Sequence, residues 1–138
     1  MKPSALAVTV VPIPGVLYLL YAFAPVVWTL ARVAGLALVC PGILLLTLAR
    51  IQLGNAFSIT PQASMLVTTG LYSRIRNPVY VFGLTLFTGI LLYTGYERFL
   101  VAVVPLAVMQ LVRAGRESKV LEARFGDAYR EYRARTWF

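Results

Sequence analysis

The chain has 138 residues, 59% of them apolar, and a formal net charge of +8 at pH 7. Its mean hydropathy of +0.77 is well above that of a soluble domain, and its length suits a single domain. With no histidine and one cysteine, Cys40, it excludes a Ser-His-Asp triad, an internal disulfide and a structural zinc site.

Apolar runs dominate the chain. They cover residues 5–23, 33–50, 79–96 and 98–113. Because one membrane span needs about 20 apolar residues, we predict an all-α, polytopic membrane protein with about four transmembrane helices. Prolines 12, 14 and 41 predict bends in the first two helices. Glu97 and Arg98 form a polar tip between the last two runs, which predicts a C-terminal helical hairpin.

The connection at residues 51–78 has 28 residues and no long apolar stretch. Connections of this length are usually functional or disordered, and this one is too apolar for a disordered linker. We therefore expect it to pack against the helices. After the last run, the helix should continue towards Arg124 and stop at Phe125 and Gly126, and Asp127 should cap a short final helix in a cytoplasmic tail, residues 114–138.

Basic residues are distributed unevenly between the two sides that four spans would create. Eleven of the thirteen fall on the side of both chain ends and of residues 51–78, and only Arg32 and Arg98 fall on the other. Basic residues favour the cytoplasmic side. We therefore predict an integral, multi-pass membrane protein with both termini in the cytoplasm. We attribute the positive charge to topology and to contact with membrane lipids, not to nucleic acid.

Two polar motifs interrupt the apolar pattern. They are Leu-Val-Thr-Thr-Gly-Leu-Tyr-Ser-Arg-Ile-Arg-Asn-Pro-Val-Tyr at residues 66–80, and Arg-Ala-Gly-Arg-Glu-Ser at 113–118 with Phe-Gly-Asp-Ala-Tyr at 125–129 and Tyr132. Irregular backbone in a membrane protein is buried in protein or lines a polar cavity, so the first motif predicts a site. In the second motif, Arg113 and Glu117 are four residues apart and share a helical face.

Together, the motifs resemble those of the isoprenylcysteine carboxyl methyltransferase family, which read Leu-Val-x-x-Gly-x-Tyr-x-x-x-Arg-His-Pro-x-Tyr and Arg-x-x-x-Glu-Glu. The related phospholipid methyltransferases carry Asn-Pro-x-Tyr at the corresponding place. The resemblance covers about residues 33–135. In this chain, Asn77 stands in place of the family's histidine and Ser118 in place of the second glutamate.

The resemblance implies an integral-membrane methyltransferase that moves a methyl group from S-adenosylmethionine to a lipid-like acceptor at the cytoplasmic face. The acceptor implied is of the isoprenylcysteine carboxylate type. Arg113 would bind the acceptor, and Arg113 and Glu117 would form the catalytic pair. The cofactor-binding residues implied are Ser64, Met65, Leu66, Val67, Gly70, Tyr72, Asn77, Pro78, Val79, Tyr80 and Glu117.

The chemistry of these residues points the same way. Glu117 can pair with a positive group of the donor, and Arg113 can orient an acceptor carboxylate through paired hydrogen bonds. A carboxylate is already deprotonated at pH 7 and needs no general base. An ammonium acceptor would have to lose a proton, and Glu117, Tyr72 and Tyr80 are the candidate groups to take it.

Other functions stay open on the sequence alone. Asn77 favours N-methylation of a phospholipid amine. Membrane reductases that use NADPH share a similar C-terminal helical core, and a non-catalytic membrane subunit with the same fold would also fit. For a lipid acceptor we expect lateral access from the bilayer, through a gap between the spans 33–50 and 79–96.

Single residues also have purely structural interpretations. Asn77, followed by proline, can simply begin a helix. Arg113 and Glu117 can form a surface ion pair of little energetic weight. Tyr129 and Tyr132 can anchor the tail at the membrane interface, and this is the role that we expect of them.

Overall fold

The computed structural model describes residues 10–54 and 66–138, and every regular element in these ranges is a helix. The elements are α2 (Pro12–Ala22), α3 (Leu30–Leu53), η2 (Gly70–Ser73), α4 (Pro78–Thr94), η3 (Glu97–Ala102), α5 (Val103–Phe125) and α6 (Asp127–Arg135). The predicted all-α fold is therefore confirmed for these residues. Ser64 and Met65, which were predicted to bind the cofactor, lie outside them, as does the start of the predicted span 5–23.

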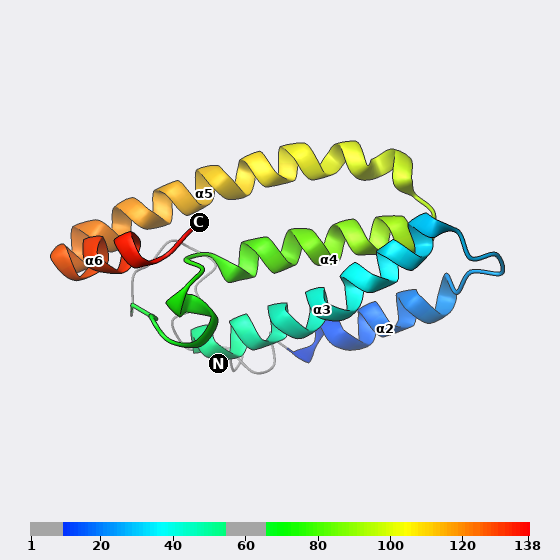
Figure 1. Ribbon diagram of the computed structural model, residues 1–138, viewed down its shortest axis with the longest axis horizontal. Helices are drawn as coiled ribbons and strands as arrows, with labels where there is room; N and C mark the ends of the chain where they lie inside the picture. The colour runs from blue at the N-terminus through cyan, green and yellow to red at the C-terminus, as the bar shows by residue number, and fades with distance from the viewer. Residues whose placement is uncertain (1–9, 55–65) are drawn as a thin grey trace.

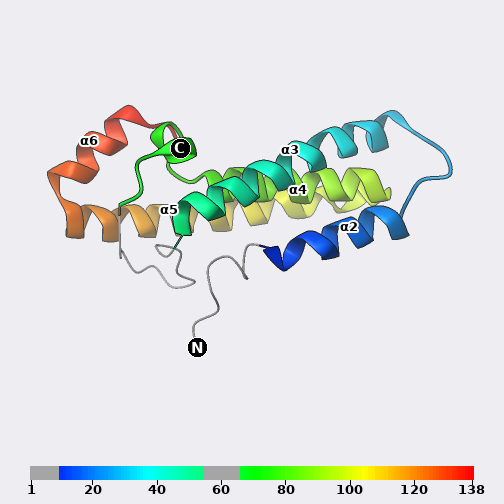
Figure 2. The same ribbon diagram turned by 90° about the horizontal axis from the view of Figure 1, so that it is seen from below.

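The long helices run alternately in opposite directions along the molecule (Figure 1). As a result, the end of α3, the segment 66–77 and α6 meet at one end, and the connections after α2 and α4 meet at the other (Figures 1 and 2). This arrangement brings the two polar motifs to the same end of the molecule.

The closest helix–helix packing in the described residues is between α3 and α4, whose backbones approach each other at glycines. A Cβ atom added to Gly35 would lie 2.8 Å from the carbonyl oxygen of Gly89, and one added to Gly89 would lie 2.9 Å from that of Gly35. Farther along, a Cβ on Gly42 would lie 3.1 Å from the backbone of Leu86. Small residues allow membrane helices to approach this closely. The contact leaves no room for a lipid, so the predicted access route between these two spans is wrong.

The helix boundaries follow the apolar runs with local corrections. The span predicted at 33–50 corresponds to α3, which begins at Leu30 because the Thr29 hydroxyl accepts a hydrogen bond from the Arg32 amide at 3.3 Å. Pro41 lies inside α3 without ending it. The span predicted at 79–96 corresponds to α4, which ends at Thr94 because Gly95 adopts the left-handed conformation, with φ of 81°.

The hairpin after α4 returns as the 3₁₀ helix η3 before α5 begins at Val103. As predicted, α5 continues well past Arg113 and stops at Phe125. Gly126, with φ of 54°, ends α5 and also occupies the N-cap position of α6. The predicted capping role of Asp127 is therefore wrong, because Asp127 is already the first residue of that helix.

Two helical stretches in the described part of the chain are long and apolar enough to cross a membrane, namely Leu30–Leu53 and Glu97–Phe125. The apolar helices α2 and α4 are shorter, with 11 and 17 residues. Large apolar side chains on the outer side of the Glu97–Phe125 stretch are exposed on the surface of the protein. Val101 is 73% exposed and Met109 is 61% exposed. Such a face suits contact with lipid chains.

Candidate functional site

The two polar motifs meet between the first turn of α4 and the middle of α5. The Tyr80 hydroxyl donates a hydrogen bond of 2.6 Å to Oε1 of Glu117. Nε of Arg113 donates to the same oxygen at 3.3 Å, and the Arg113 guanidinium carbon lies 5.9 Å from the centre of the Tyr80 ring. The carboxylate thus receives two donors, one from each motif.

This cluster remains open to solvent and ligands. The side chain of Arg113 is 43% exposed and that of Glu117 is 27% exposed. An exposed i, i+4 ion pair contributes only a few tenths of a kcal/mol, up to about 0.5. Here, however, a phenol from a distant part of the chain joins the pair. The simple surface ion pair considered from the sequence is therefore an incomplete description.

Tyr72 belongs to the same neighbourhood. It lies on η2 and is 6% exposed. Burial raises the pKa of its phenol above the ordinary value, and the nearby Tyr132, Glu117 and Tyr80 raise it further, while Arg50 lowers it. Tyr72 is therefore a neutral phenol at physiological pH.

The turn that carries Tyr72 is held by a side chain from the end of α3. Oε1 of Gln52 accepts a hydrogen bond of 2.7 Å from the Leu71 amide. Gly70 has φ of 62°, a conformation that glycine adopts without strain, and a Cβ atom added to it would lie only 2.5 Å from the Gln52 amide group. Gln52 is not among the site residues predicted from the sequence, although an amide at the polar end of an apolar run is a recognisable signal.

The C-terminal tail folds back onto the same turn. The Tyr132 hydroxyl donates to the Tyr72 carbonyl oxygen at 2.8 Å, and the Tyr129 hydroxyl donates to Oγ of Ser118 at 2.8 Å. Both rings are buried, with Tyr129 exposed by 1% and Tyr132 by 4%. The expected role of these tyrosines as interfacial anchors is wrong, because they pack α6 against the site.

The last residues pair with the segment just before α4. The Trp137 amide donates to the Arg74 carbonyl oxygen at 2.9 Å. The amides of Arg76 and Asn77 donate to a backbone oxygen of Phe138 at 2.8 and 3.1 Å. This strip holds in place the loop that leads into α4.

Asn77 occupies the N-cap position of α4, as predicted, but its side chain makes no capping hydrogen bond. Its backbone carbonyl accepts from the amides of Tyr80 and Val81 at 3.0 and 3.2 Å. Pro78 follows at the first helical position and is almost completely buried. The Asn77 side chain is thus not used for capping, the only structural role that the sequence suggested for it.

The predicted residues fall into three groups. Tyr72, Tyr80, Arg113 and Glu117 are brought together. Asn77, Pro78 and Val79 form the start of α4 immediately beside them, and Gly70 shapes the turn of Tyr72. Leu66 and Val67 lie in the irregular segment that leads to η2.

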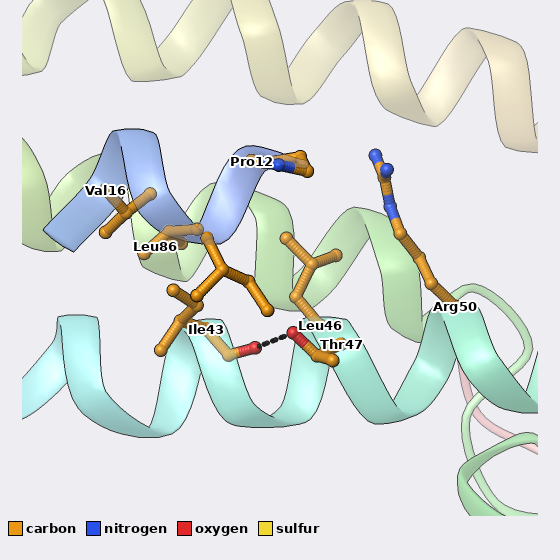
Figure 3. Close-up of a pocket in the computed structure, with 8 residues that line it drawn as sticks. Pro12, Val16, Ile43, Leu46, Thr47, Arg50 and Leu86 are labelled. Carbon is orange, nitrogen blue, oxygen red and sulfur yellow. Dashed lines mark hydrogen bonds between the residues drawn. The ribbon is translucent and has the colours of Figure 1, made fainter. Parts of the chain in front are cut away.

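A small apolar pocket lies elsewhere, between α2, α3 and α4 (Figure 3). Its volume is about 70 Å³, and its lining consists of Pro12, Ile13, Val16, Ile43, Leu46, Thr47, Arg50 and Leu86. Sites for drug-sized ligands usually have about 300–1,000 Å³. This pocket is thus too small for a nucleoside-containing cofactor, and it shares no residue with the predicted site.

The fold and the site define a helical protein that has two helical stretches long and apolar enough to cross a membrane and a polar cluster at one end. The profile of the family described as phospholipid methyltransferase matches residues 30–128, so the chain belongs to that family. The matched region contains the first motif, the helices between the motifs and the second motif as far as Ala128, which confirms the resemblance inferred from the sequence. Neither a curated protein nor a solved structure matches the chain significantly. The family is one of methyltransferases that act at membranes, and this general activity follows from membership.

Proposed function

We propose that this protein transfers a methyl group from S-adenosylmethionine to the head group of a membrane lipid at the cytoplasmic face. The observation that carries the proposal is the hydrogen bond between Tyr80 and Glu117, 37 residues apart in sequence. It joins the motif expected to bind the donor to the one expected to bind the acceptor.

The residues present suit the donor. S-adenosylmethionine carries a sulfonium, an ammonium and a carboxylate, and when bound it supplies an electrophilic methyl group. Glu117 offers a partly exposed carboxylate to a positive group, and the half-buried Tyr80 offers an aromatic ring to a cation. The start of α4 and the segment 64–72 would complete the binding site.

For the acceptor, we favour the amine of a phospholipid. Arg113 and Glu117 present one positive and one negative group side by side, which matches the phosphate and the amine of such a head group. The family match and Asn77 support the same choice. An amine must lose its proton before it attacks, and Glu117 is the carboxylate placed to receive it.

A carboxylate of the isoprenylcysteine type is the second candidate acceptor. Arg113 could pair with it, and this reaction needs no general base. In both reactions the task of the chain is to align the attacking atom with the methyl group and to exclude water.

The location of the site supports the proposed orientation. The last turn of α3, which carries Arg50, the segment 66–77 and the basic tail lie at the end of the molecule that holds the site (Figure 1). The first turn of α3, which carries Arg32, and η3, which carries Arg98, lie at the other end (Figure 1). By the positive-inside rule, the site faces the cytoplasm, where the donor is made. We extend this to four membrane crossings with both termini cytoplasmic.

The proposal is tested by incubating membranes that contain the protein with methyl-labelled S-adenosylmethionine and extracting the lipids. Label should enter lipid with the wild type and be lost with Glu117→Ala. The matched control is Glu122→Ala, which removes another glutamate of α5 whose ion pair with Arg130 is exposed. Mild alkali separates the acceptors, because it releases methyl esters as volatile methanol, whereas N-methyl groups stay bound to the non-volatile head group. Absence of label from lipid, or activity that survives Glu117→Ala, would contradict the proposal.

A further inference from the structure

The acceptor must reach the cluster by a route other than the closed contact of α3 with α4. The cluster lies where α4 faces α5, and its members Arg113 and Glu117 belong to α5. The less exposed residues of this helix recur at helical spacing and include Ala107, Gln110, Arg113, Ala114 and Glu117. We call this stripe the inner face of α5.

Gln110 is the one polar residue in the apolar run from 99 to 112. It lies on the inner face, three residues before Arg113 and seven before Glu117. At 1.5 Å of rise per residue, these positions are about 4.5 and about 10 Å along the helix axis. With the site facing the cytoplasm as proposed, Gln110 lies about one helical turn deeper in the bilayer than Arg113, the nearest member of the cluster on α5.

The side chain of Gln110 is half-buried, and the position of its amide oxygen needs an explanation. Its Oε1 atom has no solvent contact, and no hydrogen-bond donor reaches it from residues 10–54 or 66–138. An unsatisfied acceptor in an apolar environment costs about 1–3 kcal/mol. Polar side chains inside membrane helices usually mark a substrate path or a polar partner.

We propose that Gln110 determines acceptor specificity by accepting a hydrogen bond from an O–H or N–H group in the linkage region of the acceptor lipid. The lipid would lie along the inner face of α5, beside α4, with its head group at Arg113 and Glu117. This depth order is that of a lipid in its leaflet, where the linkage between head group and chains lies below the head group. The inference rests on the proposed function and adds a preference for lipids with a donor at this depth.

The test compares two acceptors that differ only in this donor. One is lysophosphatidylethanolamine, which has a free hydroxyl on its glycerol unit, and the other is its O-methyl ether. Binding to purified protein in detergent is measured by displacement of a fluorescent lipid, and methyl transfer is measured in parallel at saturating donor. The variants are Gln110→Met, which keeps the side-chain length, and the control Met109→Leu on the exposed side of α5.

For wild type and Met109→Leu we expect the hydroxyl lipid to bind three- to tenfold more tightly than its ether, the range of one hydrogen bond inside a membrane protein. Gln110→Met should abolish this preference by weakening the hydroxyl lipid alone, with KM raised, kcat little changed and donor affinity retained. Equal binding of the two lipids to the wild type, or an intact preference in Gln110→Met, would overturn the inference. If the binding preference follows Gln110 but no methyl reaches either lipid, the inference stands and the proposed function fails.

Discussion

Replacing Tyr80 by phenylalanine removes one oxygen atom and leaves the ring beside Arg113. The lost hydrogen bond is short, 2.6 Å, and its acceptor is a carboxylate. Bonds to charged groups contribute about 1.5–3 kcal/mol. Because the Glu117 side chain is 27% exposed, water can replace part of the bond, so the lower end applies, about 1.5 kcal/mol. If this bond orients Glu117 towards the donor, Tyr80→Phe should lower donor affinity about tenfold.

A double-mutant cycle with Glu117→Gln isolates the interaction. Glutamine keeps the shape of the side chain but removes the charge, so Tyr80→Phe should weaken binding much less in the Glu117→Gln background. The assay is calorimetric binding of S-adenosylhomocysteine to purified protein in detergent, with methyl transfer measured alongside. We expect a coupling free energy of about 1 kcal/mol, within the range for residues in contact.

The reasoning would be refuted if the binding free energy lost in the double mutant equalled the sum of the two single losses within about 0.3–0.5 kcal/mol. Such additivity would show that the two groups act independently on the donor. The matched control is Glu122→Gln, which weakens the exposed bond of 3.0 Å from Arg130. It should leave donor affinity unchanged. A tenfold loss of donor affinity in this control would mean that any charge change on α5 disturbs binding. The effect of Tyr80→Phe could then not be assigned to its bond with Glu117.

Three further predictions concern packing, pH and the positioning of the turn. Gly89→Ala should destabilise the protein by about 1–3 kcal/mol in a detergent unfolding assay, because the added Cβ would lie 2.9 Å from backbone atoms of α3. The control, Gly83→Ala on the same helix, places its Cβ against no neighbour and should be neutral or stabilising. Burial raises the pKa of Tyr132 to about 12 from 10.0. The stability that the neutral, buried phenol contributes is therefore complete below pH 10 and is lost as pH rises towards 12. Tyr132→Phe should flatten the fall in melting temperature between pH 10 and 12, and an unchanged slope would contradict the prediction. Gln52→Leu removes the bond of 2.7 Å to the Leu71 amide and should lower donor affinity severalfold with little change in melting temperature; equal affinity would show that the turn holds itself.

The helical class and the two motifs could be predicted because both are local properties. Apolar runs of adequate length, ended by charges or by glycine and proline, specify helices without knowledge of their neighbours. Gly126 ends α5 where predicted, and Asn77 and Pro78 begin α4 where predicted. The meeting of Tyr80 with Glu117 could also be anticipated, because the motif resemblance linked two segments that the apolar hairpin returns to the same end of the molecule.

The packing partners could not be predicted in the same way. A membrane helix is apolar on all sides, so its pattern does not show which face meets protein and which meets lipid. For this reason the gap expected between the second and third spans proved to be the tightest contact. The same uncertainty affected Tyr129 and Tyr132, since aromatic residues near basic ones suit an interface as well as a buried contact.

The sequence by itself determined the helices, their approximate ends, the asymmetry of charge and the residue types available for chemistry, because these depend on composition and on short-range spacing. Only the tertiary structure decided which faces of the helices meet. It closed α3 against α4 through their glycines, turned the tyrosines of the tail inward and directed the face of α5 that carries Gln110, Arg113 and Glu117 toward the rest of the protein. The physical reason is that the rotation of a helix about its axis is set by contacts with distant parts of the chain.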